Sequence, residues 1–285
     1  MPSKDIIIKK EIPFNTNPLY SSKPKDVRPP VNKTYKKYTK KKRSSTSNEK
    51  KDTNGVSIIT CTKKDWFINN VFNNFTRQKI EKKELIIVLN TNKIDINKWK
   101  ERAKSYDNIK IFQLSANKSL GECLNYGINK SKYNIIAKFD DDDYYSPDYL
   151  IESIDALKKK NCHVVGKGTT IVYFKSSKIL ALRTPGLEHR FVKFINGSTL
   201  VFNKEIFNNI KFHNVNTAED VKFCRDCNRR GIKIYSTSKY NHVYIRYQSK
   251  TTHTWRISDK QLLQKHCSII TNTDDYISYA DNNNL

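Results

Sequence analysis

The sequence predicts an α/β fold with a central mixed sheet flanked by helices. Short, nearly continuous apolar runs rich in β-branched residues recur between residues 56 and 139, and strands buried on both faces of a parallel sheet have this composition. Stretches of helical character separate the runs, and such alternation indicates a doubly wound sheet. The chain has 285 residues, 37% of them hydrophobic, so it is long enough to bury a sizeable core.

The first half alternates in a regular order. We expect strands at residues 56–61, 84–89, 109–114 and 134–139, and helices at residues 65–78, 98–106, 120–129 and 147–160. Pro147 suits the first turn of the last helix, because a backbone N–H there has no partner within the helix. In such sheets ligands bind outside the carboxyl ends of the strands. The fourth expected strand ends at Asp140, which places that residue at the ligand-binding edge.

The second half has shorter elements. We expect strands at residues 163–165, 170–174, 179–183, 198–202 and 232–235, and helices at residues 219–229 and 259–267. These strands are expected to extend the same sheet and to form the wall on the acceptor side. Residues 272–285 are polar, and we expect a frayed tail there.

The net charge of +25 lies partly at the start of the chain. Residues 1–54 hold 15 Lys and Arg against 5 Asp and Glu, most of the prolines and the basic run Lys40–Arg43. The apolar residues in this stretch follow no period of 2 or 3.6, so we predict a disordered basic arm. Such an arm is either a solvated linker, which is the commoner case, or a tether to nucleic acid, an anionic polymer or a partner protein.

Composition also disfavours several classes of protein. No apolar run approaches the roughly 20 residues that span a bilayer, and the N-terminus lacks the apolar core of a signal peptide. We therefore expect a cytoplasmic protein with no transmembrane segment. Of the six cysteines, only Cys224 and Cys227 have the spacing of metal ligands. Without a second pair they are better interpreted as two buried thiols on one helix turn.

The run Asp140–Asp143 is the strongest local feature of the chain. Four adjacent carboxylates repel one another and need a cation or solvent to offset their charge. In an extended chain Asp140 and Asp142 face one ligand, and carboxylate oxygens suit Mg²⁺ or Mn²⁺ bridging to a nucleotide diphosphate. A solvated acidic loop and a calcium loop are the alternatives. The position of the run after a buried strand favours a functional site.

Several motifs resemble family 2 glycosyltransferases of the GT-A fold, whose Rossmann-like central mixed sheet is flanked by helices. The matching motifs occur in the order of the family, and they are Val56-Ser-Ile-Ile-Thr60, Gly-x-x-x-Asn-x-Gly-Ile (121–128), Phe-Asp-x-Asp-Asp-x-x-x-Pro-Asp (139–148), Ile-Asn-Gly-Ser-Thr-Leu-Val-Phe (195–202), Ala-Glu-Asp (218–220) and Gly-Ile-Lys-Ile (231–234). Tyr-Ile-Arg (244–246) followed by His-Thr-Trp (253–255) is similar to bacterial members tied to spore-coat maturation. The resemblance implies a GT-A domain at residues 55–258, after the arm at 1–54 and before a C-terminal helix and frayed tail at 259–285.

The resemblance also implies roles for individual residues. Glu219 and Asp220 match the pair beside the acceptor, in which the Asp is the general base. Asp142 matches the ligand of the diphosphate-bridging metal, Mn²⁺ or Mg²⁺, and His253 matches a late metal or diphosphate ligand. The residues expected to bind the nucleotide-sugar are Thr60, Asn90, Asn125, Asp140, Asp141 and Arg246.

The chemistry of sugar transfer suits these residue types. Charge builds on the leaving diphosphate, so a metal there stabilises the transition state. A positioned carboxylate takes the proton of the acceptor hydroxyl. Arg246 is a bidentate diphosphate clamp or, equally, a surface arginine on a tyrosine-rich strand. Asn90 stands where the family has a base-binding aspartate, and its amide can hydrogen-bond a uracil edge. Leu124 stands where an arginine is common.

Three functions follow in order of preference. The first is an inverting, metal-dependent glycosyltransferase that uses a nucleotide-sugar, expected to be UDP-linked, and a polysaccharide or protein acceptor. The second is a non-catalytic structural or assembly protein on the same scaffold, which Asn90 and Leu124 motivate. The third is a nucleic-acid-binding protein that performs two-metal nucleotidyl transfer. The sequence contains no basic-aromatic recognition motif, so nucleic acid is the least favoured partner.

Overall fold

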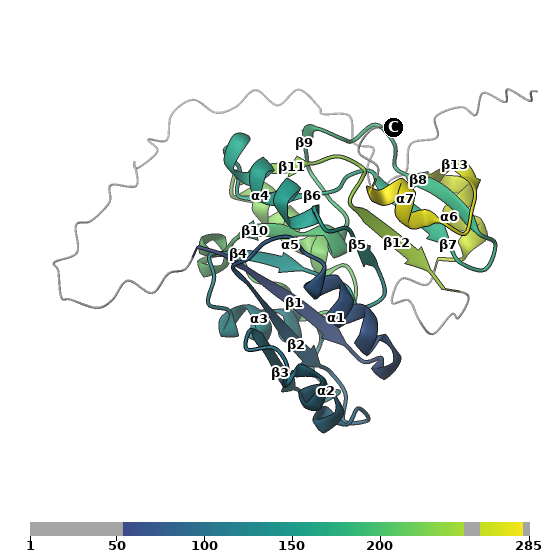
Figure 1. The fold of residues 1–285 in the computed structure, drawn as a ribbon. Coiled ribbons are helices and arrows are strands. Elements are labelled where there is room, and N and C mark those ends of the chain that lie inside the picture. Colours follow the sequence, from purple (N-terminus) through teal and green to yellow (C-terminus); the bar gives the residue numbers. More distant parts are fainter. Residues whose placement is uncertain (1–53, 248–256, 282–285) are drawn as a thin grey trace, which may run out of the picture. The chain divides into compact units, whose positions relative to one another are not determined.

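The apolar runs of the first half form four parallel strands of the larger sheet (Figure 1). The computed structural model describes residues 54–247 and 257–281. The predicted basic arm lies outside these residues. The four strands are β1 Val56–Thr62, β2 Lys83–Leu89, β3 Ile109–Gln113 and β4 Ile135–Lys138. Their order is β3-β2-β1-β4, and β1 is nearly covered on both faces, which explains its continuous apolar run.

Four further strands make this sheet mixed. They are β6 Val164–Gly166, β9 Arg190–Val192, β10 Val201–Asn203 and β11 Ile234–Ser236. β10 pairs antiparallel with both β4 and β6, so it interrupts the parallel run. The full order is β3-β2-β1-β4-β10-β6-β11-β9. The predicted fold class, a central mixed sheet flanked by helices, is confirmed.

Helices cover both faces of the larger sheet. Successive residues of a strand point to opposite faces, so Ile58 packs in one core cluster and Ile59 in the other. The first cluster includes side chains of α1 Ile68–Thr76, α2 Ile96–Ala103 and α4 Tyr149–Lys159. The second includes side chains of α3 Leu120–Lys130 and α5 Glu219–Arg229. Three short 3-10 helices complete this part of the chain, at η1 Asp65–Phe67, η2 Gly197–Thr199 and η3 Lys204–Asn208.

A second sheet of five strands differs from the expectation that all strands extend the first sheet. Its strands are β5 Tyr144–Tyr145, β7 Thr170–Phe174, β8 Ile179–Arg183, β12 His242–Arg246 and β13 Cys267–Asn272, in the order β13-β8-β7-β12-β5. β7 and β8 form an antiparallel hairpin. The outer edges of this hairpin are taken up by β12 and β13, so neither strand is left to extend the larger sheet.

The C-terminal segment is also more ordered than expected. After α6 Asp259–His266, the chain forms β13 and then α7 Tyr276–Asp281. The prediction of a frayed tail is wrong for α7, because Ala280 is fully buried and its carbonyl oxygen accepts the Asn241 N–H at 2.8 Å. Asp281 accepts hydrogen bonds from the hydroxyl of Tyr144 at 3.0 and 3.1 Å. Tertiary contacts therefore hold a segment whose own sequence is largely polar.

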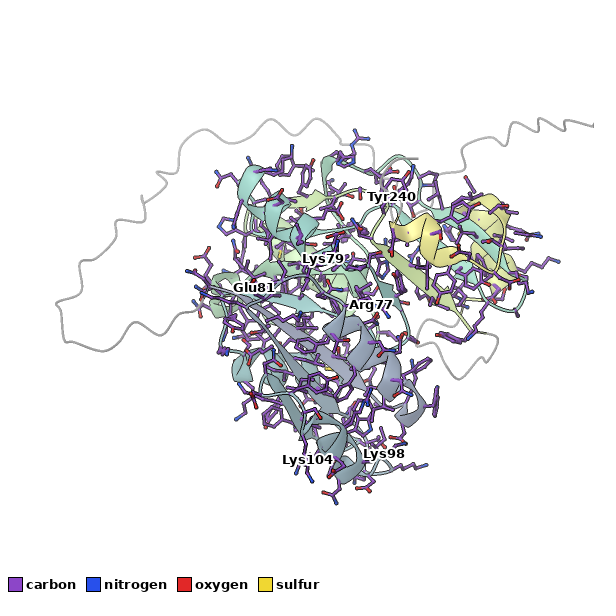
Figure 2. All side chains as sticks on the ribbon, viewed as in Figure 1. Arg77, Lys79, Glu81, Lys98, Lys104 and Tyr240 are labelled. Carbon is purple, nitrogen blue, oxygen red and sulfur yellow. The ribbon has the colours of Figure 1, made fainter. Side chains whose placement is uncertain are left out.

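The two sheets meet at the end of α1. Arg77 follows that helix (Figure 2), and its guanidinium carbon lies 4.6 Å from the centroid of the Tyr144 ring in β5. The amide of Gln78 donates to the carbonyl oxygen of Ser146 at 2.9 Å. Residues 140–143 connect β4 of the larger sheet to β5 of the second sheet. The acidic run therefore forms the turn between the two sheets, and we call residues 140–143 the acidic turn.

Candidate active site

The backbone of the acidic turn is held by neighbouring elements. The hydroxyl of Tyr145 accepts the N–H of Asp140 at 2.8 Å. The amide of Asn70, on α1, donates to the carbonyl oxygen of Asp141 at 2.8 Å and to that of Asp143 at 2.9 Å. Each bond fixes the backbone and leaves the carboxylates to other partners. The turn lies beyond the carboxyl end of β4, where the sequence predicts ligand binding.

Two lysines of the chain offset the carboxylates of this turn. The ammonium of Lys64 lies 3.0 Å from Asp141 Oδ1 and 2.6 Å from Asp142 Oδ2, and that of Lys138 lies 2.5 Å from Asp140 Oδ1. From the sequence we expected the offsetting charge to come from a bound cation or from solvent. Neither Lys64 nor Lys138 was predicted to pair with these carboxylates. Lys138 could have been noticed, because it ends β4 two residues before Asp140 and a period of two places both on one face.

Burial shapes the protonation of these groups. It raises the pKa of the Asp141 carboxyl, against the opposing effect of Lys64, and it raises that of Asp142 well above its usual range with the help of Asp141. Burial alone would lower the pKa of Lys64, but Asp142 and Asp141 outweigh it and raise that pKa. The ammonium of Lys64 therefore stays charged, and with Lys138 it stabilises negative charge on the turn.

The fourth carboxylate has a different setting. Asp143 is fully buried, accepts the N–H of Ile245 at 3.1 Å and lies 3.2 Å from Nε2 of His242. Burial and the neighbouring Asp140 raise the pKa of Asp143 to about 8, and burial lowers that of His242 to about 3. Both groups are thus neutral near pH 7. Asp143 ties the acidic turn to β12 and is not presented to a ligand.

The second group of carboxylates lies at the start of α5. Oε1 of Glu219 lies 3.9 Å from the ammonium of Lys138, so this lysine connects the predicted catalytic pair to the acidic turn. Glu219 is 6% exposed, and burial raises its pKa to about 7; Asp220 acts in the same direction and Lys138 opposes it. The residue before the helix, Ala218, has a φ of 59°, a left-handed conformation that costs energy in a residue other than glycine.

Asp220 packs against the loop that precedes β10. A Cβ atom at Gly197 would collide with the carboxyl group of Asp220 and with its Cβ. Only glycine leaves room for this contact, which explains the Asn-Gly sequence at 196–197. Oδ1 of Asp220 accepts the N–H of Val221 at 2.8 Å. The carboxylate therefore has a defined position next to the backbone of Gly197.

The predicted binders on the first two strands lie at the carboxyl edge of the sheet. The N–H of Asn90 donates to the carbonyl oxygen of Thr62 at 2.8 Å, and its amide donates to that of Ser115 at 3.0 Å. Asn90 is 3% exposed, and its contact with a base stays a prediction. Thr60 is buried within β1, and it is Thr62, two residues further along, whose hydroxyl donates to the carboxylate of Asp141.

Two other predicted binders are engaged inside the chain. Both polar atoms of the Asn125 amide bind the backbone of Phe212, at 2.8 and 3.0 Å, which joins α3 to the loop before α5. The guanidinium of Arg246 donates to Asp259 at 2.8 Å and to the carbonyl oxygen of Ile257 at 2.7 Å. Arg246 thus joins the end of β12 to the start of α6. Their roles in nucleotide-sugar binding remain predictions.

Leu124, Cys224 and Cys227 are core residues. Leu124 is 1% exposed and packs in the cluster between α3 and the larger sheet, so an apolar residue suits its position. Cys224 and Cys227 are both fully buried free thiols on α5, and burial raises the pKa of each. The interpretation of these two as buried thiols on one helix turn is confirmed.

A divalent ion at this site would need oxygen atoms from a bound substrate as well as from the protein. Within residues 54–247 and 257–281, no group of three or more His, Cys, Asp or Glu is arranged to hold a metal. His253 lies outside the described residues. Mg²⁺ is commonly held by one or two carboxylates together with substrate phosphates, and the oxygens of Asp142 meet that requirement. The residues therefore fit a metal that arrives with a diphosphate, and they do not form a complete site alone.

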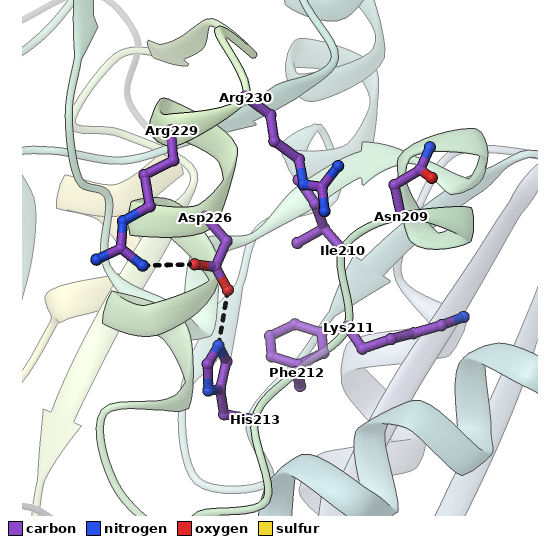
Figure 3. Close-up of a pocket in the computed structure, with 8 residues that line it drawn as sticks. All are labelled: Asn209, Ile210, Lys211, Phe212, His213, Asp226, Arg229 and Arg230. Carbon is purple, nitrogen blue, oxygen red and sulfur yellow. Dashed lines mark hydrogen bonds and ion pairs between the residues drawn. The ribbon is translucent and has the colours of Figure 1, made fainter.

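A hollow lies elsewhere, at the far end of α5 (Figure 3). It measures about 620 Å³ and is lined by Asn209, Ile210, Lys211, Phe212, His213, Asp226, Arg229 and Arg230. Asp226 lies 2.7 Å from His213 and 3.5 Å from Arg229. None of the predicted site residues lines this hollow, so it is separate from the acidic turn.

No helix in the described part of the chain is both long enough and apolar enough to cross a membrane.

Comparison with known proteins supports the sequence resemblance. Residues 57–215 match the family described as Glycosyl transferase family 2. No curated protein matches the chain significantly. Among solved structures, residues 1–349 of S. aureus TarS in complex with UDP-GlcNAc have 15% identity and a TM-score of 0.55, covering 74% of this chain and 64% of that one. Mannosyltransferase PcManGT from Pyrobaculum calidifontis, in complex with GDP-Man and Mn²⁺, has 13% identity and a TM-score of 0.52, covering 69% and 58%.

These structural similarities concern the fold. This chain spans less than two thirds of either solved structure, and identities of 13% and 15% do not carry ligands or acceptors from one protein to another. They do show that the central mixed sheet flanked by helices has the architecture of GT-A glycosyltransferases.

Proposed function

Since the family match covers more than half of its length, the chain belongs to glycosyl transferase family 2, and we propose that it is an inverting, metal-dependent glycosyltransferase. The proposed donor is a UDP-linked sugar. The proposed acceptor is a surface polysaccharide, including spore-coat glycans, or a protein side chain. The observation that carries the proposal is the joining of two carboxylate groups, the acidic turn and the start of α5, through Lys138.

The donor would bind at the carboxyl edge of the larger sheet. Asn90, whose N–H and amide are held by the carbonyl oxygens of Thr62 and Ser115, would contact the base. Asp140 and Asp141 follow β4, the strand next to β1, and would contact the ribose. Asp142, with Mg²⁺ or Mn²⁺, would hold the diphosphate, and the ion would supply Lewis-acid stabilisation of the negative charge on the leaving group.

Asp220 would act as the general base. As the acceptor oxygen forms its bond to the anomeric carbon, its proton passes to the Asp220 carboxylate, and the bond from that carbon to the diphosphate breaks on the opposite side. The nucleoside diphosphate leaves with the bonding electron pair, so the configuration of the anomeric carbon inverts. Glu219 and Lys138 would position Asp220 and set the charge around it, because both are buried beside it.

The test measures donor use. We expect the full chain to hydrolyse or transfer one sugar from a panel of UDP-, GDP- and dTDP-sugars in the presence of Mn²⁺. Asp142→Asn is expected to abolish turnover and weaken nucleotide binding. Asp148→Asn is the matched control, because Asp148 is 41% exposed, lies in the same stretch and pairs only with Lys79 among its described contacts.

Two results would contradict the proposal. One is a panel in which every donor is inert, together with unchanged metal and nucleotide binding in Asp142→Asn. The other is turnover that is equal in the two variants. A structural or assembly protein would instead bind no nucleotide-sugar, and its assembly would be lost on deletion of residues 1–54.

Asn90 provides a second, narrower test of the base. Its amide can both donate to and accept from a uracil edge, whereas aspartate can only accept when ionised. If Asn90 contacts the base, Asn90→Asp should change the order of preference among the UDP-, GDP- and dTDP-linked donors. An unchanged order would remove Asn90 from the proposed site and leave the reaction class intact.

A further inference from the structure

Lys64 occupies the position that a cation on the acidic turn would take. It lies in the loop after β1, and its ammonium is shared between Asp141 Oδ1, at 3.0 Å, and Asp142 Oδ2, at 2.6 Å. The carboxylates are nearly enclosed, with 7% and 9% of their side chains exposed, while 20% of the Lys64 side chain is exposed. The ammonium-bearing side chain is therefore the most exposed member of this group of three.

The loop that carries Lys64 is itself tied to the turn. The N–H of Lys64 donates to Oγ1 of Thr62 at 3.0 Å, and that hydroxyl donates in turn to the carboxylate of Asp141. The ammonium also lies 5.2 Å from the centroid of the Phe67 ring. The backbone at Lys64 is thus fixed next to the turn, whereas the four-carbon stem allows the ammonium to move without moving the backbone.

A divalent ion and this ammonium cannot use Asp142 together without strong repulsion between like charges. A nucleoside diphosphate offers the ammonium another anionic partner close by. From this geometry we infer that Lys64 is a resident counter-ion of the acidic turn, which moves from Asp141 and Asp142 to the diphosphate when the donor binds. Metal and nucleotide binding are then mutually dependent. The inference rests on the proposed function, and it specifies how that site is controlled.

The coupling has a definite sign. Without nucleotide, the metal must displace the ammonium into solvent, so the metal binds weakly. With nucleotide, the displaced ammonium gains a new partner, so the metal binds more tightly. By thermodynamic linkage the metal strengthens nucleotide binding by the same factor. Removing the ammonium should reduce this coupling to the part that comes from direct ligation of the metal by the diphosphate and, at the same time, strengthen binding of the metal alone.

The experiment measures Mn²⁺ binding to the full chain by electron paramagnetic resonance, with and without saturating UDP. In the wild type, UDP is expected to tighten Mn²⁺ binding by about 10-fold or more, within the usual range for coupled ligands. In Lys64→Met, Mn²⁺ alone is expected to bind about 10-fold more tightly than to the wild type, and the UDP effect is expected to be smaller than in the wild type by about the same factor. Lys79→Met is the matched control, because Lys79 is exposed and pairs with Asp148.

A second variant and a second signal guard against misfolding. Lys64→Arg keeps the charge, so it should retain weak binding of Mn²⁺ alone. In wild-type protein whose lysines carry ¹³C-methyl groups, the Lys64 methyl resonance, identified by its absence in Lys64→Arg, should shift when UDP and Mn²⁺ are added together. If Lys64→Met does not fold, the methyl resonance of the wild type tests the inference. A shift on addition of UDP and Mn²⁺ supports movement of Lys64, and an unchanged resonance overturns it.

The outcomes separate this inference from the proposed function. Equal binding of Mn²⁺ alone to the wild type and to folded Lys64→Met overturns the role of Lys64, even if UDP-sugar is turned over. Absence of UDP binding in the presence of Mn²⁺ contradicts the proposed UDP donor, and the measurement with metal alone still decides whether Lys64 blocks the ion. Tighter binding of Mn²⁺ alone to Lys64→Met, with a reduced UDP effect, supports both.

Discussion

The acidic turn and the start of α5 are both rich in carboxylates, but the partners of these carboxylates differ. Every carboxylate of the turn meets a partner supplied by the protein, from Lys138 at Asp140 to His242 at Asp143. At the start of α5, Glu219 has a lysine only at 3.9 Å, and Asp220 accepts a hydrogen bond from the N–H of the next residue. The carboxylates of the turn are thus held by side chains of the protein, whereas the described contacts of the α5 pair are fewer, which suits the proposed role of Asp220 in proton transfer.

The largest effect is expected from the available carboxylate. Asp220→Asn removes the proposed base, so kcat for transfer should fall by about 10²–10⁴-fold, the usual contribution of a general base. Nucleotide binding should be retained, because Asp220 is not in the turn. Asp226→Asn, on the same helix, is the control, since Asp226 lines the separate hollow of Figure 3. Transfer by Asp220→Asn at close to the wild-type rate would show that the α5 pair is not catalytic.

Displacing the same carboxylate without removing it should have the next largest effect. In Gly197→Ala the new Cβ collides with Asp220, so kcat should fall by about 100-fold with little change in nucleotide affinity, as expected for a misplaced catalytic group. Ala218→Gly is the companion variant. Glycine adopts the φ of 59° without strain, so this variant should fold at least as stably. Full activity in Gly197→Ala would argue that the position of Asp220 is unimportant.

The third test concerns Glu219 and the pH dependence of stability. Its pKa in the folded protein is raised to about 7 from 4.5, so protonated Glu219 stabilises the fold below about pH 4.5, and this stabilisation is lost as the pH rises through 7. Glu219→Gln cannot lose the proton. Between pH 4.5 and 7.5 its free energy of unfolding should therefore decline by on the order of 2 kcal/mol less than that of the wild type.

Urea unfolding at several pH values measures this difference. The same shift predicts that the rate of transfer rises with pH up to about 7, if the ionised pair is the active form. Lys138→Met removes the ammonium that favours ionisation, so it should move this rise to higher pH. Parallel pH profiles of stability in Glu219→Gln and the wild type would contradict the raised pKa.

The smallest effect is expected for a residue that supports the turn, because several hydrogen bonds and ion pairs hold the turn together. Tyr145→Phe leaves the Asp140 N–H without its hydroxyl acceptor and removes the bond that Tyr145 donates to the carbonyl oxygen of Ser198 at 2.7 Å. Thermal or urea unfolding should show a loss of about 1–2 kcal/mol. Tyr126→Phe is the control, because that ring packs edge-on against Phe112. Equal effects of the two changes would mean that the hydroxyl of Tyr145 does not support the turn.

The structure supports the sequence-based description of the larger sheet more fully than that of the second sheet. The strands of the first half were predictable because a strand covered on both faces is apolar along its length, as in β1 and β2. The short strands of the second sheet carry the same local pattern, and nothing in a local pattern says which sheet a strand joins. α7 was missed for a related reason, since this short helix lies in a polar tail and is held by contacts with Tyr144 and Asn241.

The sequence by itself determined the fold class, the placement of Asp140–Asp143 after a buried strand and the pair Glu219 and Asp220 at the start of a helix. These follow from periodicity and from residues adjacent in the chain. Only the tertiary structure decided what neutralises the turn. Lys64 and Asp141 are 77 residues apart, and the sequence contains many lysines that differ in no local feature. An ion pair depends on distance in space, which the fold sets by bringing the loop after β1 against the turn after β4.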